Sequence, residues 1–289
     1  MEKRSVLVIN PVGGLANRMR TLAGGIALAK AIGVDFRVIW LKNWELNAAF
    51  EDIFRSDREM SSKFSYPGML EYGILYSIPR LKNLYLTSCT LKRFGVAFAD
   101  GLETSRRFTE DDEDGTGLRR MFEDGFSRGK DCFLQGGTNV YPYDKEMYRS
   151  IFQPASEIAE VVATRVSRCG EHVVGVHIRR TDNLQSIKNS PDEVFIREME
   201  RMLSVRPETG FYLATDSDEV KARFGREFGD KVYCSRQTAV RDTLEGIKEA
   251  AIEMFTLAGT EEIIGSYFSS FSEAAAMLGN IPLRQLRVR

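Results

Sequence analysis

The sequence predicts an α/β protein made of two Rossmann-like domains that face a cleft. Short apolar segments rich in β-branched residues alternate with longer segments of helical periodicity, and this alternation runs through the chain twice. Because Phe152-Gln153-Pro154 interrupts the pattern, we place the division there, with domains at residues 1–153 and 154–289. A length of 289 residues is enough for two domains of ordinary size.

Composition narrows the class of protein. Apolar residues make up 43% of the chain and charged residues 28%, as in globular proteins with a sizeable core. The net charge of −1 gives no reason to expect binding to nucleic acid or to an acidic membrane surface. No segment approaches the ~18 apolar residues of a membrane span, and the apolar run at residues 5–9 is too short for a signal peptide. The four cysteines have no metal-ligand spacing. We therefore expect a cytoplasmic protein with reduced cysteines and no integral membrane segment.

The first cycle has the order of a βαβ unit. A strand at residues 5–10 leads through the Gly13-Gly14 turn to a helix at 15–32, which Gly33 ends. A second strand follows at 36–41, so the two strands are expected to be parallel. Beyond them the pattern predicts a helix at 48–55 and a strand at 131–135.

The second cycle is longer and begins with a helix at 156–168, for which Ser156 is a suitable N-cap. We expect Arg284, Arg287 and Arg289 to be a solvated basic tail. The remaining expected strands lie at 173–178, 210–214, 232–234 and 262–265, and the remaining helices lie at 192–203, 219–228, 243–259 and from 272 onward.

One strand in the second cycle ends in a cluster of charge. The apolar run that starts at Val173 stops at His177-Ile178-Arg179-Arg180-Thr181-Asp182, as expected of a buried parallel strand with polar residues at its carboxyl end. In open α/β sheets, ligands bind beside the carboxyl ends of strands. Two guanidinium groups there suit a phosphate or a carboxylate. An ordinary strand end with solvated arginines is the alternative, and the flanking His and Asp favour a functional site.

The turn after the first strand resembles a phosphate loop only in its position. Gly13-Gly14-Leu15-Ala16-Asn17-Arg18 follows a strand and opens a helix. It lacks both the Gly-x-Gly-x-x-Gly pattern of dinucleotide-binding domains and the Gly-Lys-Ser/Thr of a P-loop. This absence argues against an NAD-dependent oxidoreductase. A tight turn with only a structural role remains the alternative.

Four motifs, taken in order, resemble those of the fucosyltransferase superfamily. This group includes the core α1,6-fucosyltransferases, the bacterial nodulation fucosyltransferases and, more distantly, the α1,2- and protein O-fucosyltransferases. The motifs are the Gly-x-x-Asn loop that contains Gly14 and Asn17, the His177–Asp182 segment, Phe211-Tyr212-Leu213-Ala214-Thr215-Asp216, and Phe268-Ser269-Ser270-Phe271-Ser272 followed by three alanines.

The resemblance implies a fold and an activity. The superfamily has the two-domain GT-B arrangement, in which the C-terminal domain holds the sugar nucleotide and the N-terminal domain is the acceptor side. Its members transfer fucose from GDP-fucose to a hydroxyl of a glycan or glycoconjugate, with inversion at the anomeric carbon and without a metal or other cofactor. Arg179, with Arg180, would then stabilise the negative charge that develops on the β-phosphate. Asp182 would orient an arginine or act as a base.

The same resemblance assigns the donor-binding residues. His177 would hydrogen-bond the nucleotide, and Ser269, Ser270 and Phe271 would form a phosphate cradle with the N–H groups that open the last helix. Asp216, or the neighbouring Ser217, would accept hydrogen bonds from the guanine edge. Gly14, Asn17 and Arg18 would contact the donor phosphate or the acceptor.

Asp216 and its neighbours allow a second interpretation. Asp216-Ser217-Asp218 is formally an Asp-x-Asp, the element that holds manganese in another class of glycosyltransferase. The two arginines already supply positive charge, so we expect no metal there. The simplest role for Asp218 is to cap the next helix.

The general base is the least defined part of the site. Core α1,6-fucosyltransferases have a glutamate about ten residues after the motif histidine, and this chain has Ile187 there. Glu45, Asp144 and Glu245 are other carboxylates in reach of such a role, but none has a favoured spacing. A non-catalytic protein that binds a nucleotide sugar or a glycan on the same fold is therefore the alternative. The acceptor is expected to be recognised by the irregular region at 56–143.

Overall fold

The computed structural model describes residues 6–67, 114–129, 132–181, 183–237 and 239–288. The chain forms two compact units. The short segment Asp52–Arg55 belongs to unit 2, although the residues on both sides of it in the sequence belong to unit 1. Unit 1 comprises Met1–Glu51 and Ser56–Met147, and unit 2 comprises Asp52–Arg55 and Tyr148–Arg289. No helix in the described ranges has the length and apolar character that crossing a membrane requires.

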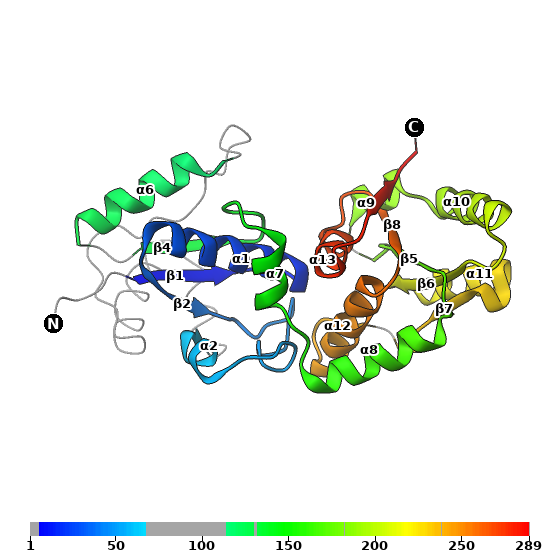
Figure 1. Ribbon diagram of the computed structural model, residues 1–289, viewed down its shortest axis with the longest axis horizontal. Helices are drawn as coiled ribbons and strands as arrows, with labels where there is room; N and C mark the ends of the chain where they lie inside the picture. The colour runs from blue at the N-terminus through cyan, green and yellow to red at the C-terminus, as the bar shows by residue number, and fades with distance from the viewer. Residues whose placement is uncertain (1–5, 68–113, 130–131, 182, 238, 289) are drawn as a thin grey trace. The chain divides into compact units, whose positions relative to one another are not determined.

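Unit 1 is built on a parallel sheet with the strand order β3-β2-β1-β4, of which β2, β1 and β4 are labelled in Figure 1. The central strand β1 (Val6–Pro11) pairs with β2 (Asp35–Ile39) on one side and with β4 (Cys132–Gly136) on the other. The chain therefore leaves β1 in one direction and returns on the opposite side, which makes a topological switch point at the carboxyl end of β1. The other elements described in this unit are β3 (Phe64–Ser65), α1 (Leu15–Ile32), α2 (Arg58–Lys63), α6 (Thr116–Ser127) and the start of α7 (Lys145–Ile151).

Unit 2 is built on a parallel sheet with the strand order β7-β6-β5-β8-β9. The chain passes from β5 (Val173–Ile178) outward through β6 (Gly210–Thr215) to β7 (Val232–Cys234), then returns to β8 (Glu262–Ser266) on the other side of β5 and ends at β9 (Leu283–Leu286). The switch point lies at the carboxyl ends of β5 and β8, where the predicted charge cluster and the last motif meet.

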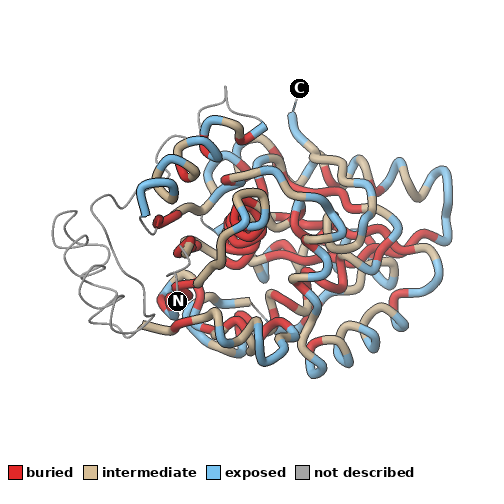
Figure 2. The backbone as a smooth tube through the Cα atoms, turned by 60° about the vertical axis from the view of Figure 1, so that its left-hand side comes forward, coloured by how far each residue is buried: buried red, intermediate tan, exposed pale blue. Residues whose placement is uncertain are grey.

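Helices cover both faces of the unit 2 sheet. On one face, α10 (Asp192–Val205) and α11 (Asp218–Phe228) bury apolar side chains against β5 and β6, including Phe195, Met199 and Phe224, each 0% exposed. On the other face α12 (Leu244–Ala258) contacts β5 and β6, and it packs on both α8 (Ser156–Arg168) and α13 (Ser270–Gly279). Gly175 in β5 permits this contact, because a Cβ there would lie 2.9 Å from Leu257 and from Thr260. Gly175 is therefore a packing glycine. In Figure 2 the buried stretches, in red, lie toward the interior of the backbone, and the exposed stretches, in pale blue, lie toward its periphery.

Most predicted elements are present, with ends shifted by a few residues. The predicted strand at 5–10 is β1, the predicted helix at 15–32 is α1, and the predicted helix at 156–168 is α8. Ser156 is the first helical residue of α8 and Ala155 occupies the N-cap, so the predicted cap is wrong by one position. Likewise Ser217 caps α11 through its side chain, and Asp218 is the first residue of that helix.

Two predicted segments differ in kind. Residues 48–55 form turns and bends instead of the predicted helix, and their backbone pairs with a distant segment: the Arg55 N–H donates to the Gln153 carbonyl at 2.8 Å, and the Ile53 carbonyl accepts from the Ala155 N–H at 2.9 Å. Phe54 forms a bridge with Pro154, which attaches Asp52–Arg55 to unit 2. The expected solvated tail is also wrong in part: Leu283–Leu286 is the edge strand β9, and Arg284 forms ion pairs with Glu198 and Glu262.

Candidate functional site

The centre of the candidate site is the contact between β5 and the first turn of α13. His177 is 4% exposed, and its Nδ1 lies 2.7 Å from Ser272 Oγ and 3.5 Å from Ser269 Oγ. Its ring stacks on the ring of Phe271, with centroids 4.7 Å apart and planes inclined by 28°. The first and last motifs of the C-terminal half therefore meet through one histidine.

His177 is a neutral side chain in this setting. Burial lowers its pKa to about 3, and the positive charges of Arg179 and Arg180 act in the same direction. Because one ring nitrogen already bonds to Ser272, at most the other is left for the expected hydrogen bond to a nucleotide. Such a low pKa also makes His177 a weak base near neutral pH.

Asp216, at the end of β6, holds the segment that follows β5. Its Oδ1 accepts from the Arg180 N–H at 2.8 Å, and its Oδ2 accepts from the Thr181 hydroxyl at 2.6 Å and from the Thr181 N–H at 3.2 Å. The Arg179 Nη1 lies 3.0 Å from Oδ2. Burial alone would raise the pKa of Asp216, but Arg179 and these hydrogen bonds hold it below the ordinary value for an aspartate. Both carboxylate oxygens of Asp216 therefore bond to groups of the protein, and a contact of Asp216 with guanine stays a prediction.

The two arginines of the first motif have different surroundings. Arg180 Nε donates to Asp192 Oδ1 at 3.0 Å, its Nη2 also bonds to Asp192, and its Nη1 donates to the Arg179 carbonyl at 2.8 Å. Nη2 donates to the Ser190 carbonyl at 2.9 Å as well. The nitrogens of the Arg180 guanidinium therefore bond to acceptors within the protein, most of them at or just before the start of α10. Arg179, whose side chain is 17% exposed, pairs with Asp216 at the carboxyl edge of the sheet.

The start of α13 supplies backbone N–H groups. Ser269 is the N-cap residue and is 4% exposed, yet within the described structure its side chain makes no capping hydrogen bond to the helix. The N–H groups of the first turn therefore lack the usual side-chain acceptor, which suits an anionic ligand. The Arg179 N–H donates to Ser266 Oγ at 3.0 Å, which joins β5 to the strand that leads into this turn.

The loop after β1 has a different role from the one expected for Arg18. The Arg18 side chain is 0% exposed and lies over the Trp40 ring at 5.2 Å. Its Nε donates to the Gly13 carbonyl at 2.7 Å, its Nη1 to the Leu41 carbonyl at 2.5 Å, and its Nη2 to Asn43 Oδ1 at 2.9 Å. The expectation that Arg18 faces a ligand is wrong. Its buried guanidinium bonds to Gly13 on one side and to Leu41 and Asn43 on the other, and so holds two loops of unit 1 together.

Gly14 and Asn17 are partly exposed in the same loop. Gly14 is the N-cap of α1, and Gly13 before it has φ +85°, a conformation that favours glycine. Asn17 Oδ1 accepts from Arg20 Nη2 at 2.8 Å, and Arg20 also bonds to the Gly137 carbonyl after β4. This loop therefore lies at the switch point of unit 1, and a ligand-binding role for Gly14 and Asn17 stays a prediction.

The structure places the candidate bases as follows. Asp182 lies outside the described residues. Asp144 accepts from the Met147 N–H at 2.6 Å at the start of α7, which is a capping role. Glu45 is 3.5 Å from Asn43 Nδ2, and Glu245 is exposed in the first turn of α12. Ile187 lies in α9 (Leu184–Asn189), so the position of the family glutamate carries no carboxylate.

The manganese interpretation receives no support from the described residues. Asp216 is paired with Arg179, and Asp218 lies 3.6 Å from Lys221 Nζ with a side chain that is 75% exposed. In the parts of the chain that the structure describes, no group of three or more His, Cys, Asp or Glu side chains could hold a metal ion.

Sequence reasoning did not find two acidic residues near this site. Asp192 is shared between Arg180 and Arg223, whose Nη1 lies 2.9 Å from its Oδ2. Glu253 on α12 is 4% exposed, and its Oε1 has no hydrogen-bond partner among the described residues. Burial and the neighbouring Glu249 raise the pKa of Glu253 to about 8. The only sequence signal for Glu253 was that a charged residue stands at a position where the spacing of apolar residues predicts the buried face of a helix.

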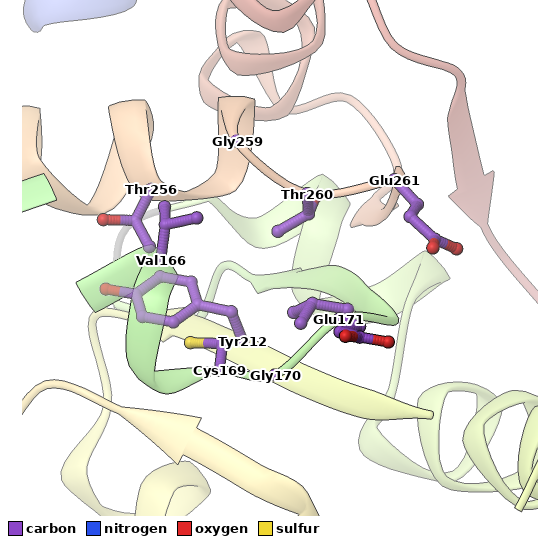
Figure 3. Close-up of a pocket in the computed structure, with 10 residues that line it drawn as sticks. Val166, Cys169, Gly170, Glu171, Tyr212, Thr256, Gly259, Thr260 and Glu261 are labelled. Carbon is purple, nitrogen blue, oxygen red and sulfur yellow. The ribbon is translucent and has the colours of Figure 1, made fainter. Parts of the chain in front are cut away.

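A small cavity lies away from this site, at the amino ends of β5 and β6 (Figure 3). Its volume is about 120 Å³, and Val166, Cys169, Tyr212 and Thr260 are among its lining residues. The Tyr212 hydroxyl accepts from Arg165 at 3.2 Å, and Thr260 Oγ1 donates to the Leu257 carbonyl at 2.7 Å. Because these polar groups are already partnered, the cavity adds nothing to the chemistry at the other end of the strands.

Comparisons with known proteins identify the fold. The sequence matches no family model, and no curated protein matches it. Solved structures do match. NodZ alpha-1,6-fucosyltransferase soaked with GDP-fucose is 17% identical with a TM-score of 0.61, over 98% of this chain and 95% of that one. Fucosyltransferase NodZ from Bradyrhizobium is 16% identical with a TM-score of 0.60, over 98% and 96%.

POFUT1 in complex with GDP-fucose is similar as well. It is 11% identical with a TM-score of 0.61, over 100% of this chain and 99% of that one. The chain therefore has the fold of these fucosyltransferase structures, with two Rossmann-like domains, as the motif resemblance predicted. At these identities the likeness is one of fold.

Proposed function

We propose that this protein is a glycosyltransferase that moves fucose from GDP-fucose to a hydroxyl of a glycan or glycoconjugate. The observation that carries the proposal is the contact of His177 with Ser272 and Ser269, because it brings the strand that carries Arg179 to the open end of α13. The fold supports the proposal, since solved structures of the same fold are named as an alpha-1,6-fucosyltransferase with GDP or GDP-fucose, and POFUT1 of the same fold is in complex with GDP-fucose.

The site suits the departure of a nucleoside diphosphate. When the bond between the sugar and the β-phosphate breaks, negative charge develops on the phosphate and must be stabilised as it forms. Arg179 supplies a permanent positive charge, and the first-turn N–H groups of α13 supply a positive dipole end and hydrogen bonds. Both stabilise the leaving group without a proton transfer.

We further propose that the reaction proceeds with inversion and without a metal. Arg179 takes the electrostatic part that a divalent cation has in metal-dependent transferases, and Asp216 fixes its orientation. Unit 2 would hold the donor, unit 1 with Gly14 and Asn17 would form the acceptor side, and the cytoplasm is the expected location.

Calorimetric titration in EDTA tests the donor site directly. GDP, GDP-fucose, GDP-mannose and UDP are titrated into the wild-type protein, Arg179→Ala and Arg226→Ala, the last an exposed arginine on α11. We expect GDP and GDP-fucose to bind without metal, to lose about tenfold or more in affinity in Arg179→Ala, and to be unaffected in Arg226→Ala. Binding that requires manganese would overturn the metal-independent mechanism, and absence of GDP binding in every condition would overturn the donor site.

Turnover separates the enzyme from the alternative. Ile187 stands where relatives have a glutamate, which favours a non-catalytic nucleotide-sugar or glycan-binding protein on the same fold. Release of GDP from GDP-fucose that depends on Arg179 supports the transferase. Tight GDP-fucose binding with no release of GDP, with or without a mixture of glycan acceptors, supports the alternative.

A further inference from the structure

Phe268 is an exposed aromatic residue in an otherwise buried turn. It lies between β8 and α13, where Ser266 is 0% exposed and Ser269 is 4% exposed, yet Phe268 itself is 65% exposed. Its ring contacts that of Tyr267 at a centroid distance of 6.2 Å. Phe268 therefore presents its ring to solvent directly before the N-cap of α13, at the start of that helix.

The backbone of Phe268 is also held in an unusual conformation. Its φ is +59°, which a side chain larger than that of glycine rarely adopts, and it is one of two such residues in the described chain. Asn183 Nδ2 donates to the Phe268 carbonyl at 2.9 Å, and Ser186 Oγ donates to the Tyr267 carbonyl at 2.8 Å. The N-cap and first turn of α9 therefore fix the strained residue in place.

A second exposed apolar side chain adjoins this contact. Leu184 follows Asn183 directly and is 80% exposed. The hydrogen bond from Asn183 to Phe268 thus joins two loops that each present an apolar side chain to solvent, beside the open end of α13. Elsewhere in this part of the site, Arg179, Asp216 and Thr181 offer charged and polar groups.

We propose that Phe268, together with Leu184, forms an apolar wall for the transferred sugar and selects a 6-deoxy sugar over its 6-hydroxy counterpart. This inference rests on the proposed function. When the β-phosphate binds at the start of α13, the sugar attached to it lies next to that phosphate. Phe268 is the residue directly before the N-cap of α13, so its side chain is the one placed to contact this sugar. Fucose presents a methyl group where L-galactose presents a CH₂OH group, and an apolar wall stabilises the first and desolvates the hydroxyl of the second.

The test compares two sugar nucleotides that differ only in this hydroxyl. GDP, GDP-fucose and GDP-L-galactose are titrated into the wild-type protein, Phe268→Ala, Leu184→Ala and Val205→Ala. Val205 is a matched control, because it is 76% exposed on α10. We expect the wild-type protein to prefer GDP-fucose by about fourfold or more, which corresponds to ~0.8 kcal/mol for one buried methyl group. Phe268→Ala should remove this preference and leave the affinity for GDP within about twofold.

Further variants keep the result interpretable. Phe268→Leu retains an apolar side chain and should keep the preference in part, whereas Phe268→Gly removes the side chain and suits the positive φ, so it serves if Phe268→Ala does not fold. Equal losses for GDP and GDP-fucose would overturn the inference, because Phe268 would then only shape the phosphate turn. An unchanged preference in Phe268→Ala would overturn it as well. If the wild-type protein does not bind GDP, the proposed function itself fails, and the GDP titration alone shows this.

Discussion

Asp216 Oδ2 lies 3.0 Å from Arg179 Nη1, so the residue that ends β6 orients the arginine that ends β5. The same carboxylate accepts the N–H groups of Arg180 and Thr181. One aspartate therefore fixes both the backbone and the guanidinium of the first motif. This arrangement makes Asp216 a positioning residue for Arg179, whatever else it contacts when a nucleotide binds.

We predict that Asp216→Asn weakens the use of GDP-fucose and that Asp218→Asn does not. The asparagine keeps one acceptor but loses the charge that holds Arg179, so kcat/KM for GDP-fucose should fall by about 10- to 100-fold. Asp218 is the matched control, because it lies two residues away with a side chain that is 75% exposed. Steady-state kinetics measures both, first in EDTA and again with added manganese. Equal losses in the two variants would instead favour the Asp-x-Asp metal interpretation.

Arg180 should matter more for stability than for binding. Its guanidinium is bonded to Asp192 and to the Ser190 carbonyl, with side-chain exposures of 15% for Arg180 and 14% for Asp192. Arg180→Ala leaves this carboxylate with one partner fewer, so the free energy of unfolding should fall by about 2 kcal/mol. Urea unfolding measures this, with Arg223→Ala as the control that also contacts Asp192 but is 40% exposed. A loss of GDP affinity as large as that of Arg179→Ala would contradict this division of roles.

Arg18 should be required for the folding of unit 1. Truncation of this fully buried side chain removes its hydrogen bonds to Gly13, Leu41 and Asn43 and leaves a cavity beside Trp40. Arg18→Ala should lower the free energy of unfolding by about 3 kcal/mol or more. Arg20→Ala, on the same helix and partly exposed, should cost about 1 kcal/mol or less. Urea unfolding of both variants is the measurement, and similar small losses would contradict the role of Arg18 in holding the two loops together.

The local sequence patterns predicted the strands, helices and turns, because short-range spacing of residues defines these elements. The apolar run at Val173–Ile178 and the helical periodicity at Leu15–Ile32 lie in the structure as β5 and α1, because period and turn residues are sufficient to define such elements. The fold followed from the order of these elements and from the four motifs. The same reasoning brought His177 and Ser269 to one site, since both lie at carboxyl edges of neighbouring strands.

Local sequence patterns did not predict which residues distant along the chain contact each other. Arg18 was expected to face a ligand and is buried instead, because a sequence shows that a guanidinium is present but not which carbonyls and carboxylates surround it. The edge strand Leu283–Leu286 was missed because Arg284, close to Arg287 and Arg289, resembles part of a solvated tail, whereas in the fold Arg284 pairs with Glu198 and Glu262. Residues 48–55 were misassigned because their backbone hydrogen bonds go to residues 153–155, a partner that helical spacing does not reveal.

Glu253 should make the protein less stable as the pH rises toward 8. Burial and Glu249 raise its pKa in the folded state to about 8, while the unfolded carboxyl has an ordinary pKa of about 4.3. Between these values the folded state binds one more proton than the unfolded state, so the free energy of unfolding falls with rising pH, by up to about 1.4 kcal/mol per pH unit for this group. Glu253→Gln does not titrate and should lose that slope.

Thermal unfolding at about pH 5 and about pH 8 tests this linkage. Glu253→Gln should be similar to the wild-type protein at the lower pH and more stable at the higher pH, because only the wild-type side chain must then either keep its proton or bury a charge. Glu245→Gln is the control, since Glu245 lies on the same helix and is exposed. A difference between Glu253→Gln and the wild-type protein that is the same at both pH values would show that Glu253 does not titrate in this range, and its unpartnered Oε1 would then be a cost of packing alone.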